Sequence, residues 1–168
     1  MGYTHYYKIS IEKYKADETA NRAYRNARIE INQLAEFAQT KGIVDLDIKE
    51  TGKMKTDTMF NGIEEENQDH EDFYLPYLLN MTDTHWTYSG FCKTARKPYD
   101  IVVTAALFVL KKHLQGAVKI DSDGYNNDKA YPKYCDDEIK AGFKLYKKFQ
   151  KECASIPAMD IPMTYYFK

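Results

Sequence analysis

The chain has 168 residues, of which 43% are hydrophobic and 29% charged, so it is long and apolar enough to form one globular domain with a buried core. Its 24 basic and 25 acidic residues give a formal net charge of −1, which argues against a nucleic-acid coat protein and against nucleic acid as a partner. The three cysteines form no CxxC pair and the longest apolar run is too short to span a bilayer, so we expect a cytoplasmic protein rather than a secreted or membrane protein.

The N-terminal part of the chain shows a strand pattern followed by a helix pattern. Residues 3–10 alternate aromatic or aliphatic side chains with polar ones, which predicts a β-strand with one partly polar face. Asp17 has the properties of a helix N-cap, and apolar residues then recur in steps of four and three from Ala20 to Ala38. These features predict an amphipathic helix that ends at Gly42.

The middle of the chain contains strand patterns separated by a polar loop. Alternation predicts a strand over 43–49, with a hairpin partner around Phe60 after the ETGK turn. The acidic stretch 64–72 is typical of an exposed loop. We interpret 73–79, which a proline interrupts, as a buried connector or a short helix, and 86–92 as a further strand.

The C-terminal half is predicted to contain two helices around one short strand. Pro98 suits the first turn of a helix, and the apolar run 101–110 predicts a buried central helix. We expect a strand over 117–121 and an amphipathic helix over 136–153. The apolar tail 154–168 is expected to dock on its own domain or on a neighbouring subunit, because such a tail would be adhesive in solution.

This order of elements predicts the fold class. Residues 1–168 are expected to form a single α+β domain of two layers, a mostly antiparallel sheet with about three main helices packed on it. Aromatic residues are unusually frequent, with 15 tyrosines, eight phenylalanines and one tryptophan. Tyrosine suits both base stacking and subunit interfaces, so we expect a homo-oligomer.

The stretch FCKTARKPYD gathers positive charge immediately before the predicted central helix. The N–H groups at a helix N-terminus favour anions, and Lys93, Arg96 and Lys97 add full charges while Thr94 adds a hydroxyl donor. The glycines of a Walker motif are missing, so this is a hypothesis of a phosphate site of another kind. The alternative is a solvated basic loop that pairs with the acidic stretch 64–72.

Other side chains complete the predicted ligand site. Candidates for stacking on a base or hydrogen-bonding to it are Tyr3, His5, Tyr7, Trp86 and Tyr99. Asp100 and Asp123 are candidates for binding a ribose hydroxyl or orienting a cationic side chain. No complete catalytic motif and no metal-ligand spacing occurs in the sequence, so we expect no catalytic residue, no metal and no cofactor.

Three segments, MGYTHY, FCKTARKPYD and KIDSDG, resemble those of a group of small, mostly uncharacterised proteins from phages and prophage regions. The resemblance covers 22 of the 168 residues, about one eighth of the chain. It implies a phage accessory protein acting in the host cytosol. Proteins of that kind include non-enzymatic sponges, which sequester nucleotide immune signals and so inhibit the anti-phage defence of the host.

The leading hypothesis is therefore a non-enzymatic protein that binds a phosphorylated small molecule, namely a nucleotide such as a cyclic immune signal. A second hypothesis is an enzyme acting on a nucleotide or nucleic acid, with His5 and the aspartates as acid and base. A third is an inhibitor that blocks a host protein through the acidic stretch 64–72 and the apolar tail 154–168.

Overall fold

The computed structural model describes residues 2–13, 18–49, 57–126 and 134–153. The helices in these residues are α1 (Glu18–Thr40), α2 (Asp100–Leu114) and α3 (Asp137–Cys153), with 3-10 turns η2 (Glu64–Glu66) and η3 (Gln115–Ala117). The strands are β1 (Thr4–Glu12), β2 (Leu46–Ile48), β3 (Thr58–Gly62), β4 (Phe73–Leu75), β5 (Asn80–Met81), β6 (His85–Lys93), β7 (Val118–Ser122), β8 (Tyr125–Asn126) and β9 (Tyr134–Cys135). The predicted α+β architecture with three main helices is confirmed.

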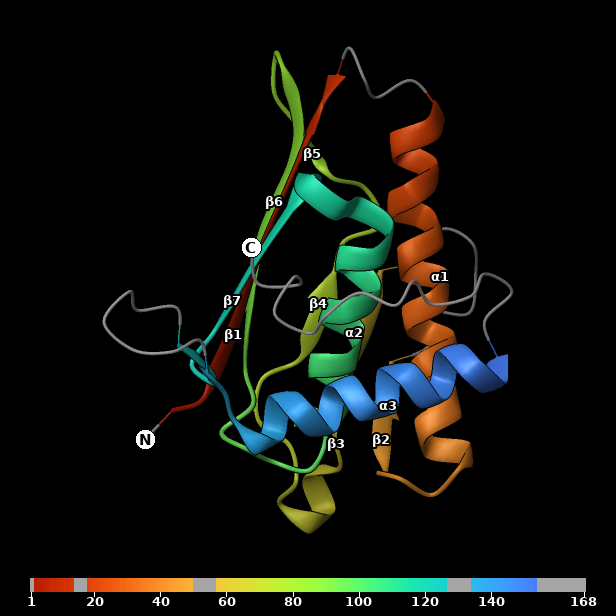
Figure 1. Ribbon diagram of the computed structural model, residues 1–168, viewed down its shortest axis with the longest axis vertical. Coiled ribbons are helices and arrows are strands. Elements are labelled where there is room, and N and C mark those ends of the chain that lie inside the picture. The colour runs from red at the N-terminus through yellow and green to blue at the C-terminus, as the bar shows by residue number, and fades with distance from the viewer. Residues whose placement is uncertain (1, 14–17, 50–56, 127–133, 154–168) are drawn as a thin grey trace.

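The main sheet has four strands in the order β5-β6-β1-β7, and all neighbours are antiparallel. The chain passes from β1 through α1 and the inserted strands β2, β3 and β4 to β5, and from β6 through α2 to β7. One strand of the sheet lies between the two ends of each crossover. This is the ferredoxin-like, or split β-α-β, arrangement. Figure 1 shows α1 and α2 on the same side of this sheet, so that the other side carries no helix in the described part of the chain.

The remaining strands form separate sheets, β2-β3-β4 and the short pair β8-β9, rather than extending a single sheet. The predicted pairing of these two strands is confirmed, since Ile48 pairs with Phe60 across β2 and β3, while the ETGK turn lies outside the described residues. The interpretation of 73–79 as a connector or short helix is wrong for its first three residues, which form β4. Phe73 and Leu75 are buried, whereas Tyr74 between them in the sequence is half-buried. This segment therefore has the two-residue period of a strand.

The predicted central helix is confirmed as α2, which packs against α1, α3 and β7. Its middle, from Val102 to Leu110, is buried on every side, which explains why the sequence there is continuously apolar. Burial lowers the pKa of Lys111, whose ammonium donates a hydrogen bond to the carbonyl of Val118 at 3.1 Å. Pro98, expected in the first turn, lies just before the helix, because α2 begins at Asp100.

The crossing of α2 and α3 depends on Gly142. A Cβ atom at this position would lie 2.4 Å from Cβ and Cγ2 of Thr104, a buried residue of α2. We expect Gly142→Ala to lower the free energy of unfolding by about 1–3 kcal/mol, because the two helices must move apart. Urea denaturation measures this loss. Gly116→Ala is the control, since no atom lies within 4 Å of its added Cβ; equal effects of the two variants would contradict the prediction.

Two further expectations concern a membrane span and the C-terminal tail. No helix among residues 2–13, 18–49, 57–126 and 134–153 combines the length and the apolar character that crossing a membrane requires. The apolar tail 154–168, expected to dock on this domain or on a neighbouring subunit, lies outside the described residues.

Candidate functional site

The structure brings together the two segments that the sequence suggested as parts of one site. β1 pairs with β6 along its whole length, which places the N-terminal residues beside the loop that joins β6 to α2. The backbone N–H groups of Thr94 and Ala95 donate hydrogen bonds to the carbonyl of Tyr3, at 2.9 and 3.2 Å. The guanidinium of Arg96 lies over the Tyr3 ring, 4.0 Å from its centroid. Both Ala95 and Arg96 have positive φ, so this loop has a tightly specified conformation.

The centre of this junction is a buried hydrogen-bonded network. Oδ1 of Asp100 accepts from His5 Nε2 at 2.7 Å and from Thr94 Oγ1 at 2.5 Å. His5 and Thr94 are 0% exposed and Asp100 is 3% exposed. Within the described residues, Nδ1 of His5 and Oδ2 of Asp100 have no hydrogen-bond partner. The network fastens the start of α2 to β1, and it presents none of these three side chains to a ligand in solution.

Three predicted aromatic contacts, Tyr3, Tyr7 and Tyr99, are also buried. Their hydroxyls donate hydrogen bonds inside the protein, to Asp136 Oδ2 at 2.9 Å, the Tyr74 carbonyl at 2.8 Å and the Glu71 carbonyl at 2.7 Å. Burial is the main cause that raises the pKa of each of these phenols. The arrangement does not favour base stacking by these rings, because each ring faces the core.

The start of α2 offers little to a phosphate. The backbone N–H of Asp100 donates to the Lys97 carbonyl at 2.9 Å, and those of Val102 and Val103 donate to the Tyr99 carbonyl at 2.9 and 3.1 Å. The carboxylate of Asp100 already occupies the positive end of the helix dipole. An incoming anion would therefore meet three donors that are already in use and a negative charge in place.

The side chains of Arg96 and Asp123 are held by contacts within the protein. Nη1 of Arg96 forms ion pairs with Glu138 at 2.5 Å and Asp136 at 3.3 Å, although its side chain is 49% exposed. These pairs fasten the loop to the start of α3. Oδ2 of Asp123 accepts a hydrogen bond from the backbone N–H of Thr4 at 2.9 Å, so this carboxylate supports the start of β1.

The basic loop also packs against the acidic stretch 64–72. The ammonium of Lys97 donates to the carbonyl of Asn67 at 2.6 Å. The backbone N–H of Lys93 donates to Oε2 of Glu71 at 2.9 Å, and the N–H of Glu71 returns a bond to the Lys93 carbonyl at 3.2 Å. These contacts favour the alternative interpretation of the basic loop, as a loop that pairs with this stretch.

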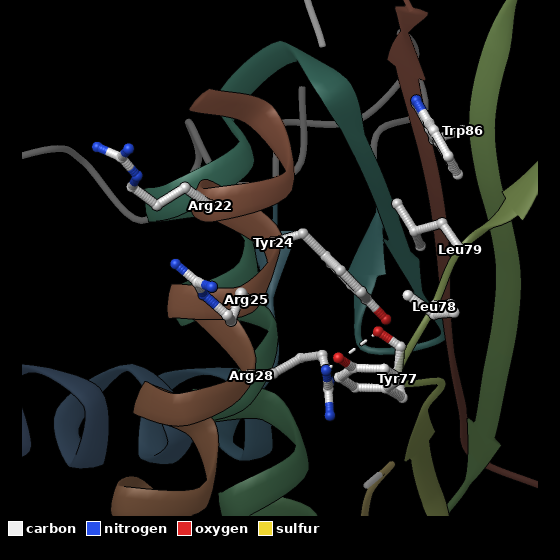
Figure 2. Close-up of a pocket in the computed structure, with 8 residues that line it drawn as sticks. All are labelled: Arg22, Tyr24, Arg25, Arg28, Tyr77, Leu78, Leu79 and Trp86. Carbon is white, nitrogen blue, oxygen red and sulfur yellow. Dashed lines mark hydrogen bonds between the residues drawn. The ribbon is translucent and has the colours of Figure 1, made fainter. Parts of the chain in front are cut away.

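Away from the buried junction, a cavity with a volume of about 390 Å³ lies between α1 and the chain that joins β4 to β5 (Figure 2). Trp86 of β6, a predicted stacking residue, forms one end of it. The residues that line the cavity are Arg22, Tyr24, Arg25, Arg28, Tyr77, Leu78, Leu79 and Trp86. Among the predicted site residues, Trp86 alone belongs to this lining in the described part of the chain.

Hydrogen bonds hold one wall of this cavity in place. Tyr24 donates from its hydroxyl to the carbonyl of Pro76 at 2.6 Å, and Nη1 of Arg28 donates to the carbonyl of Tyr77 at 3.1 Å. The Arg28 guanidinium lies 5.2 Å from the centroid of the Tyr77 ring and 5.8 Å from that of Tyr24. Asp57 accepts from the backbone N–H of Tyr77 at 2.6 Å. The wall is therefore shaped before any ligand arrives.

The cavity combines positive charge with aromatic and aliphatic walls. Arg22, Arg25 and Arg28 follow one another at three-residue spacing, which places them along one side of α1. Figure 2 shows Arg28 reaching across to Tyr77, whereas the side chains of Arg22 and Arg25 point away from Tyr77 and Trp86. The eight lining residues include no Asp or Glu. A flat, anionic ligand fits this chemistry, because guanidinium groups pair with phosphate and stack on rings.

Sequence reasoning missed the three arginines, although their spacing on a predicted helix was a usable signal. The signal is weak alone, because a row of arginines on a helix is usually a solvated surface. The row of arginines borders a cavity because the chain from Tyr77 to Leu79 faces α1 in the folded protein, although it lies about 50 residues further along the sequence.

Metal binding receives no support from the described residues. No group of three or more histidine, cysteine, aspartate or glutamate side chains within 2–13, 18–49, 57–126 and 134–153 is arranged to hold a metal ion. Cys92 is buried in the core, and this burial raises the pKa of its thiol. The thiol therefore keeps its proton and is unreactive.

Comparisons with known proteins give no indication of function, so the proposal below rests on the geometry of the chain. No protein-family model, no curated protein and no solved structure matches the chain at a significant level.

Proposed function

We propose that this protein binds and sequesters a nucleotide-like small molecule in the cavity between α1 and the chain that joins β4 to β5. The observation that carries the proposal is the row of Arg22, Arg25 and Arg28 beside a wall of tyrosine, leucine and tryptophan side chains. The site thus differs from the basic loop before α2, but the class of ligand, a phosphorylated molecule with an aromatic base, is the one the sequence suggested.

The dimensions and surfaces of the cavity support this class of ligand. Its volume of about 390 Å³ lies within the roughly 300–1,000 Å³ of ligand pockets in proteins. A base would lie against Trp86 and Tyr77, since every base has a flat face that stacks on an aromatic ring. The phosphate would then be bound mainly by Arg25, whose exposed side chain points away from the aromatic wall in Figure 2 and would turn towards the cavity on binding. Arg28, which is 6% exposed and held by its bond to Tyr77, would add positive charge beside it.

The lining also supports binding without chemical change. Arginine remains protonated at all physiological pH values, so it is neither a general acid nor a general base there. Burial raises the pKa of the Tyr24 phenol, so this hydroxyl keeps its proton at neutral pH. His5, the acid or base of the enzyme hypothesis, is 0% exposed and lies in the junction between β1 and α2.

The resemblance to phage proteins selects the first ligands to test. Cyclic dinucleotides and cyclic ADP-ribose isomers carry both a base and phosphate groups, as does AMP. Adenosine has the base without the phosphate, so it separates the contribution of the arginines from that of the aromatic wall.

The chain contains one tryptophan, so its fluorescence reports directly on the proposed site. We expect at least one of the phosphorylated ligands to quench Trp86 fluorescence with saturation, and adenosine to bind at least tenfold more weakly. Arg25→Glu should weaken the binding of the phosphorylated ligand at least tenfold, because a charge-assisted contact becomes a repulsion. Mass spectrometry of heat-released ligand should return it intact.

Lys144→Glu is the matched control, since Lys144 is also an exposed cation, on α3. It makes the same change in net charge away from the cavity and should leave the affinity unchanged. Equal weakening by Lys144→Glu and Arg25→Glu would assign binding to the overall charge rather than to this cavity. A cleaved ligand would show that the protein is an enzyme. If none of the phosphorylated ligands quenches the fluorescence of Trp86, the proposal is wrong.

A further inference from the structure

The helix-free face of the main sheet carries an exposed aromatic pair. Tyr6 of β1 lies directly opposite Phe91 of β6, and these are the two central strands of the sheet. The side chains are 46% and 60% exposed. Their strand neighbours Tyr7 and Cys92 point to the other face and are buried, Tyr7 against Phe73 of β4. Two adjacent aromatic rings in solvent at the middle of a sheet mark an interaction surface.

Lysines flank this pair along the strands. Lys8 follows Tyr6 by two residues and therefore lies on the same face, about 7 Å further along β1. It is directly opposite Lys119 of β7, and both lysines are exposed. Lys93 follows Phe91 by two residues in the other direction. Like charges directly opposite on neighbouring strands repel, so an anion that bound between Lys8 and Lys119 would relieve this repulsion.

The face also contains hydrogen-bonding groups and a carboxylate. Ser89 lies opposite Lys8, and Asp121 lies opposite Tyr6. Oδ1 of Asp121 accepts a hydrogen bond from the backbone N–H of Ser122 at 2.9 Å. A shallow hollow of about 370 Å³ joins these residues to the aromatic pair. The positive charge is local and modest, so contact with the two rings must supply much of the affinity of any partner.

We propose that this face binds single-stranded nucleic acid. Tyr6 and Phe91 stack on two successive bases, and Lys8 and Lys119 contact the phosphate between or beside them. Aromatic side chains on the open face of a four-stranded sheet are a general solution for holding unpaired bases, because every base presents a flat face. A duplex offers no such faces, and its stacked bases do not reach the rings.

The near-zero net charge of the chain is consistent with this proposal. It argues against binding driven by the charge of the whole protein, but stacking depends on the rings and not on the net charge. The surface is separate from the nucleotide cavity, because the arginines belong to α1 and Trp86 lies six residues from buried Cys92 along β6, hence on the face opposite Phe91. The proposal therefore stands or fails independently of the cavity.

Fluorescence anisotropy with labelled RNA and DNA single strands of about ten nucleotides tests the proposal at about 50 mM salt. We expect saturable binding of at least one single strand and much weaker binding of the matching duplex. Tyr6→Ala and Phe91→Ala should each weaken the single-strand affinity about tenfold or more. Lys119→Ala should weaken it a few-fold and reduce its dependence on salt.

Ile29→Ala is the control, because Ile29 is an apolar side chain of similar exposure, 48%, on α1. It should leave the single-strand affinity unchanged. Excess AMP should not displace the oligonucleotide, and the Tyr6→Ala and Phe91→Ala variants should retain any Trp86 response to a nucleotide.

Three results would overturn the proposal. The first is no binding of either single strand at about 100 μM protein. The second is displacement of the oligonucleotide by AMP, which would place it in the nucleotide cavity. The third is a dimer, seen by analytical ultracentrifugation, that dissociates in Tyr6→Ala and Phe91→Ala, which would make this face a contact between two copies of the chain.

Discussion

Replacing Asp100 by alanine is expected to lower the free energy of unfolding by about 3–5 kcal/mol, and with it the Tm by about 10 °C. The reason is that one carboxylate oxygen accepts hydrogen bonds from both His5 and Thr94. All three residues are at most 3% exposed, so water cannot replace the lost acceptor without opening the structure. Differential scanning calorimetry and urea denaturation measure the two quantities.

The Asp100→Asn variant separates the shape of the side chain from its charge. An amide keeps an oxygen that accepts from Thr94 or from His5, but it carries no charge to orient the imidazole. We expect a smaller loss, of about 1–2 kcal/mol. An equal loss in the two variants would mean that the charge of Asp100, rather than its accepting oxygen, stabilises the junction.

Asp137 provides the matched control. It is also an acidic residue in the first turn of a helix, α3, but its side chain is 94% exposed. Asp137→Ala should change the free energy of unfolding by no more than about 0.5 kcal/mol. If Asp100→Ala is as mild as Asp137→Ala, the buried network contributes nothing, and its role is not to hold α2 on β1.

The elements that could be predicted from sequence are those whose pattern is local. The step of three and four residues between Ala20 and Ala38 predicted a helix, which is observed as α1 and is followed by Gly42 with a φ of +63°. The helix predicted over 136–153 is observed as α3. In both helices the apolar stripe is contained in the segment itself, so no knowledge of the partner element was needed.

The division of the strands between sheets could not be predicted in this way. The pairing of Ile48 with Phe60 is local, because a short connection joins their strands. The pairing of β4 with β3 is local in the same sense, whereas the placement of β6 beside β1 rather than beside β4 depends on contacts between distant segments. A strand pattern alone does not identify the neighbour of a strand.

The predicted site illustrates the same limit at the level of single side chains. Alternation in β1 places Tyr3, His5 and Tyr7 on the face that also carries Ile9, and that face packs on the helices. The same alternation places Tyr6 and Lys8 on the opposite face, which is open. Sequence alone shows that the two sets point in opposite directions, but the side on which the helices pack is decided by the tertiary structure.

The second large effect concerns Glu30, which joins the three helices. Its carboxylate in α1 accepts hydrogen bonds from Lys112 at 2.9 Å and His113 at 2.5 Å, both in α2, and from the side-chain amide of Gln150 in α3. Burial alone would raise the pKa of Glu30, but the hydrogen bonds from His113, Lys112 and Gln150 outweigh it and lower the pKa from 4.5 to about 2. The ionised carboxylate is therefore a stabilising part of the helix packing.

The pH dependence follows from the direction of this shift. A carboxyl group whose pKa is lower in the folded state contributes its full stabilisation above the pKa of the unfolded state, here 4.5, and loses it as the pH falls towards 2. At neutral pH we expect Glu30→Gln to lower the free energy of unfolding by about 3 kcal/mol. The difference between wild type and variant should shrink steadily between about pH 5 and pH 2.

Glu36→Gln distinguishes this effect from a general change in charge, because Glu36 is an exposed glutamate on the same helix. Urea denaturation of the wild type and both variants at a series of pH values from 7 down to about 2 gives the comparison. Glu36→Gln should follow the wild-type curve throughout, since its side chain remains in water when the protein is folded. A constant difference between wild type and Glu30→Gln at every pH would show that Glu30 stabilises the helices by its packing and neutral hydrogen bonds, and that its charge has no part in holding α1, α2 and α3 together.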